Sequence, residues 1–167
     1  IYKDGKEIIN RSPADAINNH FALVPEDRKD QGLVLIRTLL HNIEMSSLKK
    51  LSHFGFMNGK QETEYADRYM KQLHVKAAGS YQQAGDLSGG NQQKVIFGKW
   101  LERGPQVFMM DEPTRGIDVG AKYEIYELII QMAKQGKTII VVSSEMPEIL
   151  GITNRIGVMS NGHLSGI

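Results

Sequence analysis

LSGGNQQK at residues 87–94 and VFMMDEP at residues 107–113 are the two most informative stretches of this chain of 167 residues. Ser88 is a favourable N-cap residue, and the apolar positions that follow it predict a helix that continues to about Arg103. The apolar run at the start of the second stretch predicts a buried strand. A helix followed closely by a buried strand is typical of an α/β fold.

The alternation of helix and strand continues towards the C-terminus. Apolar residues at helical spacing run from Ile125 to Ala133, and Gly136 is placed to end that helix. Two further strands are predicted, from Thr138 to Ser143 and from Arg155 to Met159. Strands that are separated by helices imply a mostly parallel sheet with helices packed on it.

The N-terminal segment predicts three short elements. Asp4-Gly5 favours a two-residue hairpin turn, because both central positions of a type I′ turn need a positive φ. Ser12, followed by a proline, predicts the start of a short helix. Residues 21–24 predict a strand, and the polar residues 26–32 behind it predict an exposed loop.

A different pattern occupies the middle of the chain. From about Leu39 to Gln83, apolar residues repeat at helical spacing and the signals for strands vanish. We therefore expect a mostly helical insert between two parts of an α/β core.

Composition excludes several classes of protein. The chain has 20 basic and 19 acidic side chains, so its net charge of +1 provides no general attraction to nucleic acid. It has no cysteine, which excludes disulfides and thiolate metal sites. Its longest aliphatic run, residues 139–142, is far shorter than the roughly 20 apolar residues of a membrane span. The chain begins at Ile1 without a leader pattern, so we expect it to be a piece of a longer polypeptide.

The acidic pair Asp111-Glu112 follows the predicted buried strand directly. Open α/β sheets bind ligands at the carboxyl ends of their strands, and two adjacent carboxylates there are costly without a cation or a proton. In a nucleotide hydrolase the first acid would hold Mg²⁺, and the second would orient or deprotonate the attacking water. Taken alone, an Asp-Glu pair is more commonly the polar start of an exposed loop, so the pair by itself is a weak signal.

The glycines at the start of the predicted helix favour an anion site. Gly89 and Gly90 leave backbone N–H groups accessible to a phosphate at a helix N-terminus. A glycine-rich turn before a surface helix is the alternative, and the octapeptide as a whole argues against it.

Residues 87–93 resemble the signature motif of ATP-binding-cassette ATPases, and residues 107–112 resemble their Walker B strand. Residues 114–118 are similar to the D-loop, residues 139–145 to the strand that leads to the switch position, and residues 25–33 to a form of the Q-loop. That Q-loop form is typical of the second cassette in tandem ATP-binding subunits of bacterial sugar importers. The resemblance covers nearly the whole chain, and it is greatest to galactose/methyl-galactoside importers, with ribose importers next.

The resemblance implies three parts of an ATPase. Residues 1–38 would hold the antiparallel hairpin and the Q-loop of the core, and residues 39–86 would form a helical subdomain. Residues 87–167 would hold the signature helix, Walker B strand, D-loop and switch region.

The resemblance also implies ligands, roles and partners. Glu112 and Ser144 would be catalytic, Asp111 and Glu26 would bind Mg²⁺, and the bound nucleotide would be ATP. The predicted nucleotide contacts are Leu87, Ser88, Gly89, Gly90, Asn91, Gln92, Asp118 and Glu26. The partners would be the first cassette of the same polypeptide, membrane permease subunits and, indirectly, a periplasmic sugar-binding protein, at the cytoplasmic face of the inner membrane. No nucleic-acid partner is expected.

The sequence departs from the family pattern in three ways, and the last two suggest a degenerate nucleotide site. The phosphate loop G-x-x-x-x-G-K-[ST] is missing from the sequence, so the fold would be an incomplete P-loop NTPase whose phosphate loop lies upstream. The switch position, usually histidine, is Ser144, and a neutral hydroxyl stabilises developing negative charge less well. The Q-loop glutamine is replaced by Glu26, which would repel phosphates unless a cation offsets its charge.

Three functions follow from this sequence. The leading hypothesis is the second ATPase cassette of a sugar importer. A second hypothesis is a non-catalytic cassette that regulates or docks on a permease, and Ser144 and Glu26 favour it. A third is a chromosome-maintenance or DNA-repair ATPase, which would need long heptad segments or a basic channel that the sequence lacks.

Overall fold

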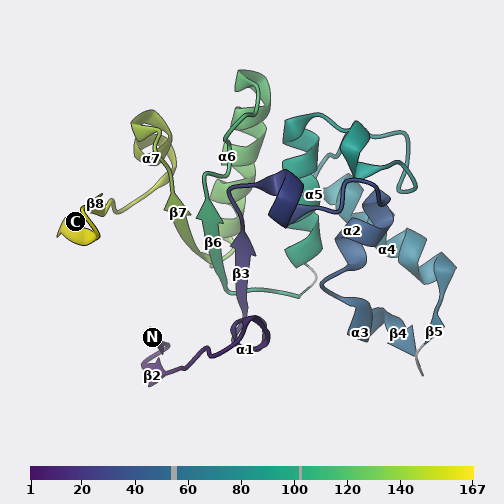
Figure 1. The fold of residues 1–167 in the computed structure, drawn as a ribbon, viewed down its shortest axis with the longest axis horizontal. Helices are drawn as coiled ribbons and strands as arrows, with labels where there is room; N and C mark the ends of the chain where they lie inside the picture. Colours follow the sequence, from purple (N-terminus) through teal and green to yellow (C-terminus); the bar gives the residue numbers. More distant parts are fainter. Residues whose placement is uncertain (54–55, 102) are drawn as a thin grey trace.

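The computed structural model describes residues 1–53, 56–101 and 103–167. Its central sheet has three strands, with β6 (Val107–Asp111) between β3 (Phe21–Val24) and β7 (Thr138–Val142), as Figure 1 shows. Both pairings are parallel, and Val107 lies opposite the first residue of each neighbour. The predicted α/β class with a parallel sheet is confirmed.

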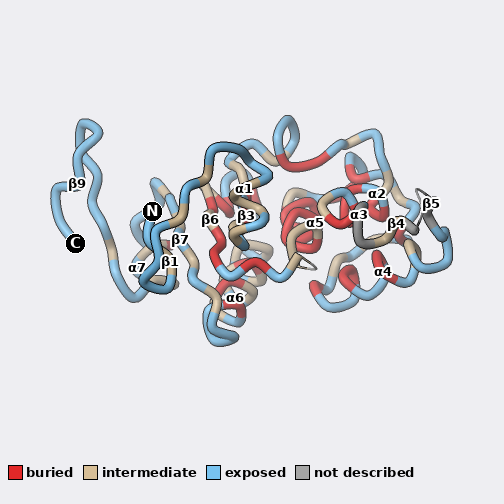
Figure 2. The backbone as a smooth tube through the Cα atoms, turned by 90° about the horizontal axis from the view of Figure 1, so that it is seen from below, coloured by how far each residue is buried: buried red, intermediate tan, exposed pale blue. Residues whose placement is uncertain are grey.

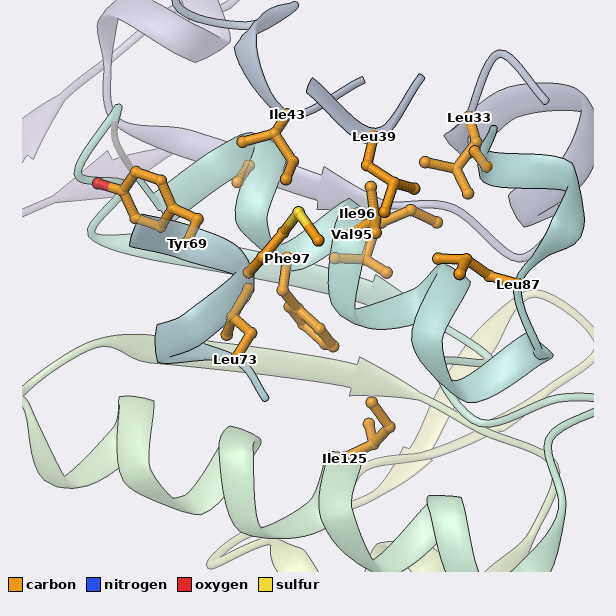
Figure 3. Close-up of a cluster of buried hydrophobic side chains, with 14 of the residues drawn as sticks. Leu33, Leu39, Ile43, Tyr69, Leu73, Leu87, Val95, Ile96, Phe97 and Ile125 are labelled. Atoms are coloured by element: carbon orange, nitrogen blue, oxygen red, sulfur yellow. The ribbon is translucent and has the colours of Figure 1, made fainter. Parts of the chain in front are cut away.

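Two long helices cover one face of this sheet. They are α5 (Gly89–Leu101) and α6 (Val119–Lys134), and side chains from both belong to one core cluster with Phe108 and Met110 of β6. Figure 3 shows Val95, Ile96 and Phe97 of α5 within this cluster. Alternate residues of a strand point to opposite faces, so Leu23 and Ile140 face away from these helices, and each is 49% exposed.

Local sequence explains where α6 begins and ends. Asp118 caps α6 by accepting a hydrogen bond from the backbone N–H of Ala121 at 2.9 Å. Gly136 follows α6 with a φ of +83°, a conformation that glycine adopts without strain. The predicted helical stripe is confirmed in part, because Ile125, Ile129 and Met132 are buried whereas Ala133 is exposed.

The middle of the chain is mostly helical, as expected. It contains α2 (Leu39–Glu44), α3 (Leu48–Leu51) and α4 (Gly59–Gln72). The expectation that strands vanish here is wrong, because β4 (Ser52–His53) and β5 (Phe56–Met57) form a short antiparallel pair. Strands of two residues carry no periodicity that a sequence pattern could reveal.

The entry and exit of the helical segment lie side by side. The N–H of Leu39 donates to the carbonyl of Gln82 at 2.9 Å, and the N–H of Ala84 donates to the carbonyl of Arg37 at 3.0 Å. A short 3₁₀ turn, η2 (Ala84–Asp86), then leads to α5. These backbone bonds bring the two ends of residues 39–86 together, and the subdomain boundary stays a prediction.

The predicted N-terminal hairpin, helix and strand are confirmed, whereas the loop predicted over residues 26–32 is confirmed only in part, because the π-helical turn η1 (Arg28–Gly32) forms there and buries Gly32. β1 (Tyr2–Lys3) and β2 (Lys6–Glu7) form a hairpin, and its turn residues Asp4 and Gly5 both have positive φ. α1 (Pro13–Asn18) begins with a capping box between Ser12 and Asp15.

The C-terminal strand departs from expectation. After α7 (Met146–Ile152), β8 (Val158–Ser160) begins three residues later than predicted and pairs antiparallel with β9 (His163–Gly166). The cause is Asn161-Gly162, whose positive φ values form a hairpin turn. Figure 2 shows both terminal hairpins as exposed segments away from the buried core. None of the helices in the described ranges has the length and apolar character that a membrane span requires.

Candidate functional site

The two acids predicted as functional lie at the carboxyl end of the central strand. Asp111 is the last residue of β6, and the N–H of Glu112 donates to the carbonyl of Val142 on the neighbouring strand β7 at 2.8 Å. Oε1 of Glu112 accepts a hydrogen bond from the backbone N–H of Ser144 at 2.8 Å. The structure therefore brings together the two residues that were expected to be catalytic.

The backbone of Glu112 is in a conformation that few residues adopt. Its φ is +42°, which is uncommon for a residue with a side chain and costs energy unless neighbouring bonds fix it. The hydrogen bonds to Val142 and from Ser144 fix it here. This geometry turns the Glu112 side chain towards the loop that follows β7.

A buried carboxylate connects the loops after β6 and β7. Glu148 of α7 accepts hydrogen bonds from Thr114 Oγ1 at 2.9 Å and from Ser143 Oγ at 2.6 Å. The Ser143 hydroxyl in turn accepts from the N–H of Glu145 at 3.1 Å. Pattern reasoning gave Glu148 no role, because its two partners lie in different segments of the chain.

Arg28 ties the loop after β3 to the loop after β6. Asp27 caps the π-helical turn η1 (Arg28–Gly32), and the Arg28 guanidinium donates to the carbonyl oxygens of Arg115 and Gly116. Arg115 in turn forms an ion pair with Glu26. Glu26, expected to meet nucleotide and Mg²⁺, thus already has a cationic partner. A cavity of about 330 Å³ lies among Glu26, Asp27, Arg28, Lys29, Arg115 and Gly116.

The start of α5 presents a polar tip. Asn91 donates from Nδ2 to Ser88 Oγ at 3.0 Å and accepts from the N–H of Lys76 at 2.8 Å. Ser88 itself is exposed. A second cavity, of about 310 Å³, opens beside this tip. It is lined by Lys76, Ser88, Gly90, Asn91, Asp118, Gly120, Ala121 and Glu124.

The structure separates the predicted nucleotide contacts, because Glu26 lines the first cavity. Ser88, Gly90, Asn91 and Asp118 line the second cavity together. The side chains of Leu87 and Gln92 are buried, 8% and 4% exposed, and Gln92 donates to the carbonyl of Ala84. These two residues support the tip from within the fold.

Both glycines of the tip are required by close packing. A Cβ at Gly89 would lie 2.9 Å from Nη2 of Arg28 and 3.2 Å from the carbonyl oxygen of Gly116. A Cβ at Gly90 would lie 2.6 Å from Cβ of Ala121 on α6. Only glycine allows such a close approach at these positions.

Two ion pairs fix α6 beside the site. Lys94 is 4% exposed, and its Nζ lies 2.5 Å from Oε2 of Glu124. The hydrogen bond from Lys94 is the main cause that lowers the pKa of Glu124. Lys122 donates to both carboxylate oxygens of Glu145, at 2.5 and 2.7 Å, and this contact raises the pKa of Lys122. The second pair joins α6 to the residue after Ser144.

The carboxylates at the end of β6 fit a magnesium ion that the phosphates of a nucleotide would also bind. In the described part of the chain, three or more His, Cys, Asp or Glu residues are nowhere gathered as a metal cluster. Asp111 and Glu112 supply two carboxylates at the strand end. Mg²⁺ typically takes one or two protein carboxylates together with phosphate oxygens and water, which matches this set.

Comparison with known proteins identifies relatives of the chain. The family described as "ABC transporter" matches residues 1–115. The galactose/methyl galactoside import ATP-binding protein of Treponema pallidum is 56% identical over 98% of this chain and 33% of its own length. The ribose import ATP-binding protein of Oceanobacillus iheyensis is 45% identical over 99% of this chain and 34% of its own length. The chain thus spans about a third of the length of these relatives, and the predicted similarity to galactose and ribose importer subunits is confirmed.

Solved structures share the fold. A nucleotide-free ATP-binding cassette of an ABC transporter superposes with a TM-score of 0.81 at 22% identity. The match covers 99% of this chain and 67% of the cassette's chain. A cassette in a post-hydrolysis state, bound to ADP and phosphate, gives a TM-score of 0.75 at 21% identity, over 99% of this chain and 70% of its own. These similarities show that the chain has the fold of such cassettes.

Proposed function

The chain belongs to the ABC transporter family, and from that premise we propose that it is an ATP-hydrolysing part of the ATP-binding subunit of a bacterial sugar importer. The names of its relatives point to galactose, methyl galactoside or ribose as the sugar. We place the subunit at the cytoplasmic face of the inner membrane, on permease subunits that a periplasmic sugar-binding protein supplies.

The observation that carries this proposal is the hydrogen bond between Glu112 Oε1 and the N–H of Ser144. A general base must be held within reach of the water that it deprotonates, and this bond fixes one of the two carboxylate oxygens. Asp111 would hold Mg²⁺, directly or through water. Bound Mg²⁺ would neutralise negative charge on the phosphates of ATP. Glu26 would join the metal site only if its ion pair with Arg115 opened.

The tip at Ser88, Gly89 and Gly90 would act at a different ATP molecule. In the family, two cassettes meet head to tail, so this tip would complete a site whose phosphate loop belongs to the first cassette. The exposed Ser88 hydroxyl and the helix N-terminus are suited to an anionic phosphate. Asn91 and Asp118 line the same cavity and would contact the nucleotide from its sides.

The test is the substitution Glu112→Gln in the full-length protein. Loss of the base should lower ATP hydrolysis by about 10² to 10⁴ while ATP binding persists. Glu127→Gln, at an exposed position of α6, provides a matched control that should hydrolyse ATP normally. An unchanged rate in Glu112→Gln would assign turnover to the other cassette.

A non-catalytic, permease-docking cassette is the second candidate. Two observations favour it: the switch position is a serine, and the carboxylate of Glu26 is engaged by Arg115. Photolabelling of the full-length protein with a reactive ATP analogue separates the two functions. A docking module would show no labelling near Asp111, whereas a hydrolytic site would be labelled there.

A further inference from the structure

Glu148 has the environment of a residue that positions others. It is 3% exposed, and each of its two carboxylate oxygens accepts a hydrogen bond from a different hydroxyl group. A buried carboxylate is costly unless hydrogen bonds replace the lost water, and bonds to a charged acceptor are among the stronger ones. The two donors, Thr114 and Ser143, are therefore held closely.

These two donors flank the proposed base. Thr114 lies two residues after Glu112, and Ser143 immediately precedes Ser144, whose N–H binds the Glu112 carboxylate. The result is a closed ring of contacts that runs from Glu112 through Ser144 and Ser143 to Glu148, and back through Thr114. Glu148 and Glu112 are the two carboxylates of this ring, and Tyr126 of α6 contacts it through the side chain of Thr114.

The direction of the hydrogen bonds is also fixed. The Ser143 hydroxyl accepts from the N–H of Glu145, so its own proton is free to point at Glu148. The Thr114 hydroxyl donates to the other oxygen of Glu148. A glutamine at position 148 could accept only one of the two bonds, because its NH₂ group donates and does not accept.

We propose that Glu148 is a positioning residue for the general base: it locks the loop after β6 to the loop after β7, so that the N–H of Ser144 meets the Glu112 carboxylate. The inference rests on the proposed function of Glu112. Glu148 does not touch the nucleotide in this scheme and acts only through the position of Glu112.

The experiment measures ATP hydrolysis by Glu148→Gln in the full-length protein. Misplacement of a catalytic group by about 1 Å costs up to 100-fold, so we expect kcat to fall about 10- to 100-fold. KM for ATP should change less than about twofold, because contacts that hold ATP are unaffected. A variant that loses thermal stability but keeps its kcat would show that Glu148 is merely structural and would overturn the proposal.

A double variant tests whether Glu148 acts through Glu112. In a Glu112→Gln background, Glu148→Gln should lower kcat no further, because residues that act as a unit are not additive. A full additional loss would overturn the proposal. If Glu112→Gln alone leaves hydrolysis unchanged, the proposed function fails; if it lowers hydrolysis and Glu148→Gln does not, only the present inference fails.

An isosteric pair covers the case in which Glu148→Gln does not fold. Thr114→Val removes the hydroxyl and keeps the shape, whereas Thr114→Ser keeps the hydroxyl. The valine variant should show the loss of kcat, and the serine variant should recover most of it. Equal rates in the two variants would overturn the role of the hydrogen bond to Glu148.

Discussion

A methyl group added at Gly90 tests the close contact between α5 and α6. The new Cβ would lie 2.6 Å from Cβ of Ala121, whereas carbon atoms in contact are normally about 3.5–4.0 Å apart. Overpacking of this kind costs about 1–3 kcal/mol, and the better helix propensity of alanine returns about 1 kcal/mol. Gly90→Ala should therefore reduce the free energy of unfolding by up to about 2 kcal/mol.

The double variant isolates the overlap. Ala121→Gly alone should cost about 1 kcal/mol of helix propensity. In Gly90→Ala with Ala121→Gly, the methyl group has moved from one helix to the other and the overlap is gone. The two substitutions should then show a favourable coupling energy of about 1–3 kcal/mol.

Urea unfolding provides the assay, followed by the fluorescence of Trp100, the single tryptophan of the chain, which lies on α5. Gly151→Ala is the control, because a Cβ at this position of α7 meets nothing within 4 Å. It should leave stability unchanged or raise it by up to about 1 kcal/mol. Additivity of Gly90→Ala and Ala121→Gly within about 0.5 kcal/mol would refute the reasoning from the overlap.

Two further predictions concern charged residues. Burial, with the neighbouring charge of Glu62 as the next cause, raises the pKa of Glu44 from 4.5 to about 7, so its contribution to stability is complete below about pH 4.5 and is lost as the pH rises towards 7. Glu44→Gln should consequently melt at a higher temperature than the unmodified protein at pH 8 but not at pH 4.5. A difference in melting temperature that stays the same from pH 4.5 to pH 8 would contradict the raised pKa of Glu44. Arg28→Lys gives up the paired contact with the Arg115 and Gly116 carbonyls and should lower ATP hydrolysis by the full-length protein. Lys134→Ala, at the exposed end of α6, should not, and equal rates in these two variants would refute a role for the Arg28 contact.

The features that could be predicted from the sequence depend on short-range rules. The turn at Asp4-Gly5 and the capping box at Ser12 are set by neighbours within a few residues. The parallel order of the sheet follows from strands that alternate with helices. The approach of Glu112 to Ser144 follows as well, because each comes after one of two adjacent parallel strands.

The features that could not be predicted depend on contacts between distant segments. The two acceptors of Arg28 lie 87 and 88 residues away along the chain, and no periodicity reports such a contact. The bridge through Glu148 joins α7 to a residue 34 positions earlier. The wrong start predicted for β8 has another cause, because the sequence does contain the hairpin signal Asn161-Gly162 that sets this strand.

The backbone and the side chain of Ser144 have different roles in the loop after β7. The Ser144 backbone holds the Glu112 carboxylate, so this bond forms with any residue at position 144 except proline. On the proposed function, a serine there in place of histidine would remove charge stabilisation at the phosphate but would leave the base in position. In the proposed scheme Ser143 and Glu148 hold this loop through their part-buried hydrogen bond, whereas the Ser144 side chain is exposed. A departure at the switch position thus argues for slower chemistry at this site and not for loss of the site.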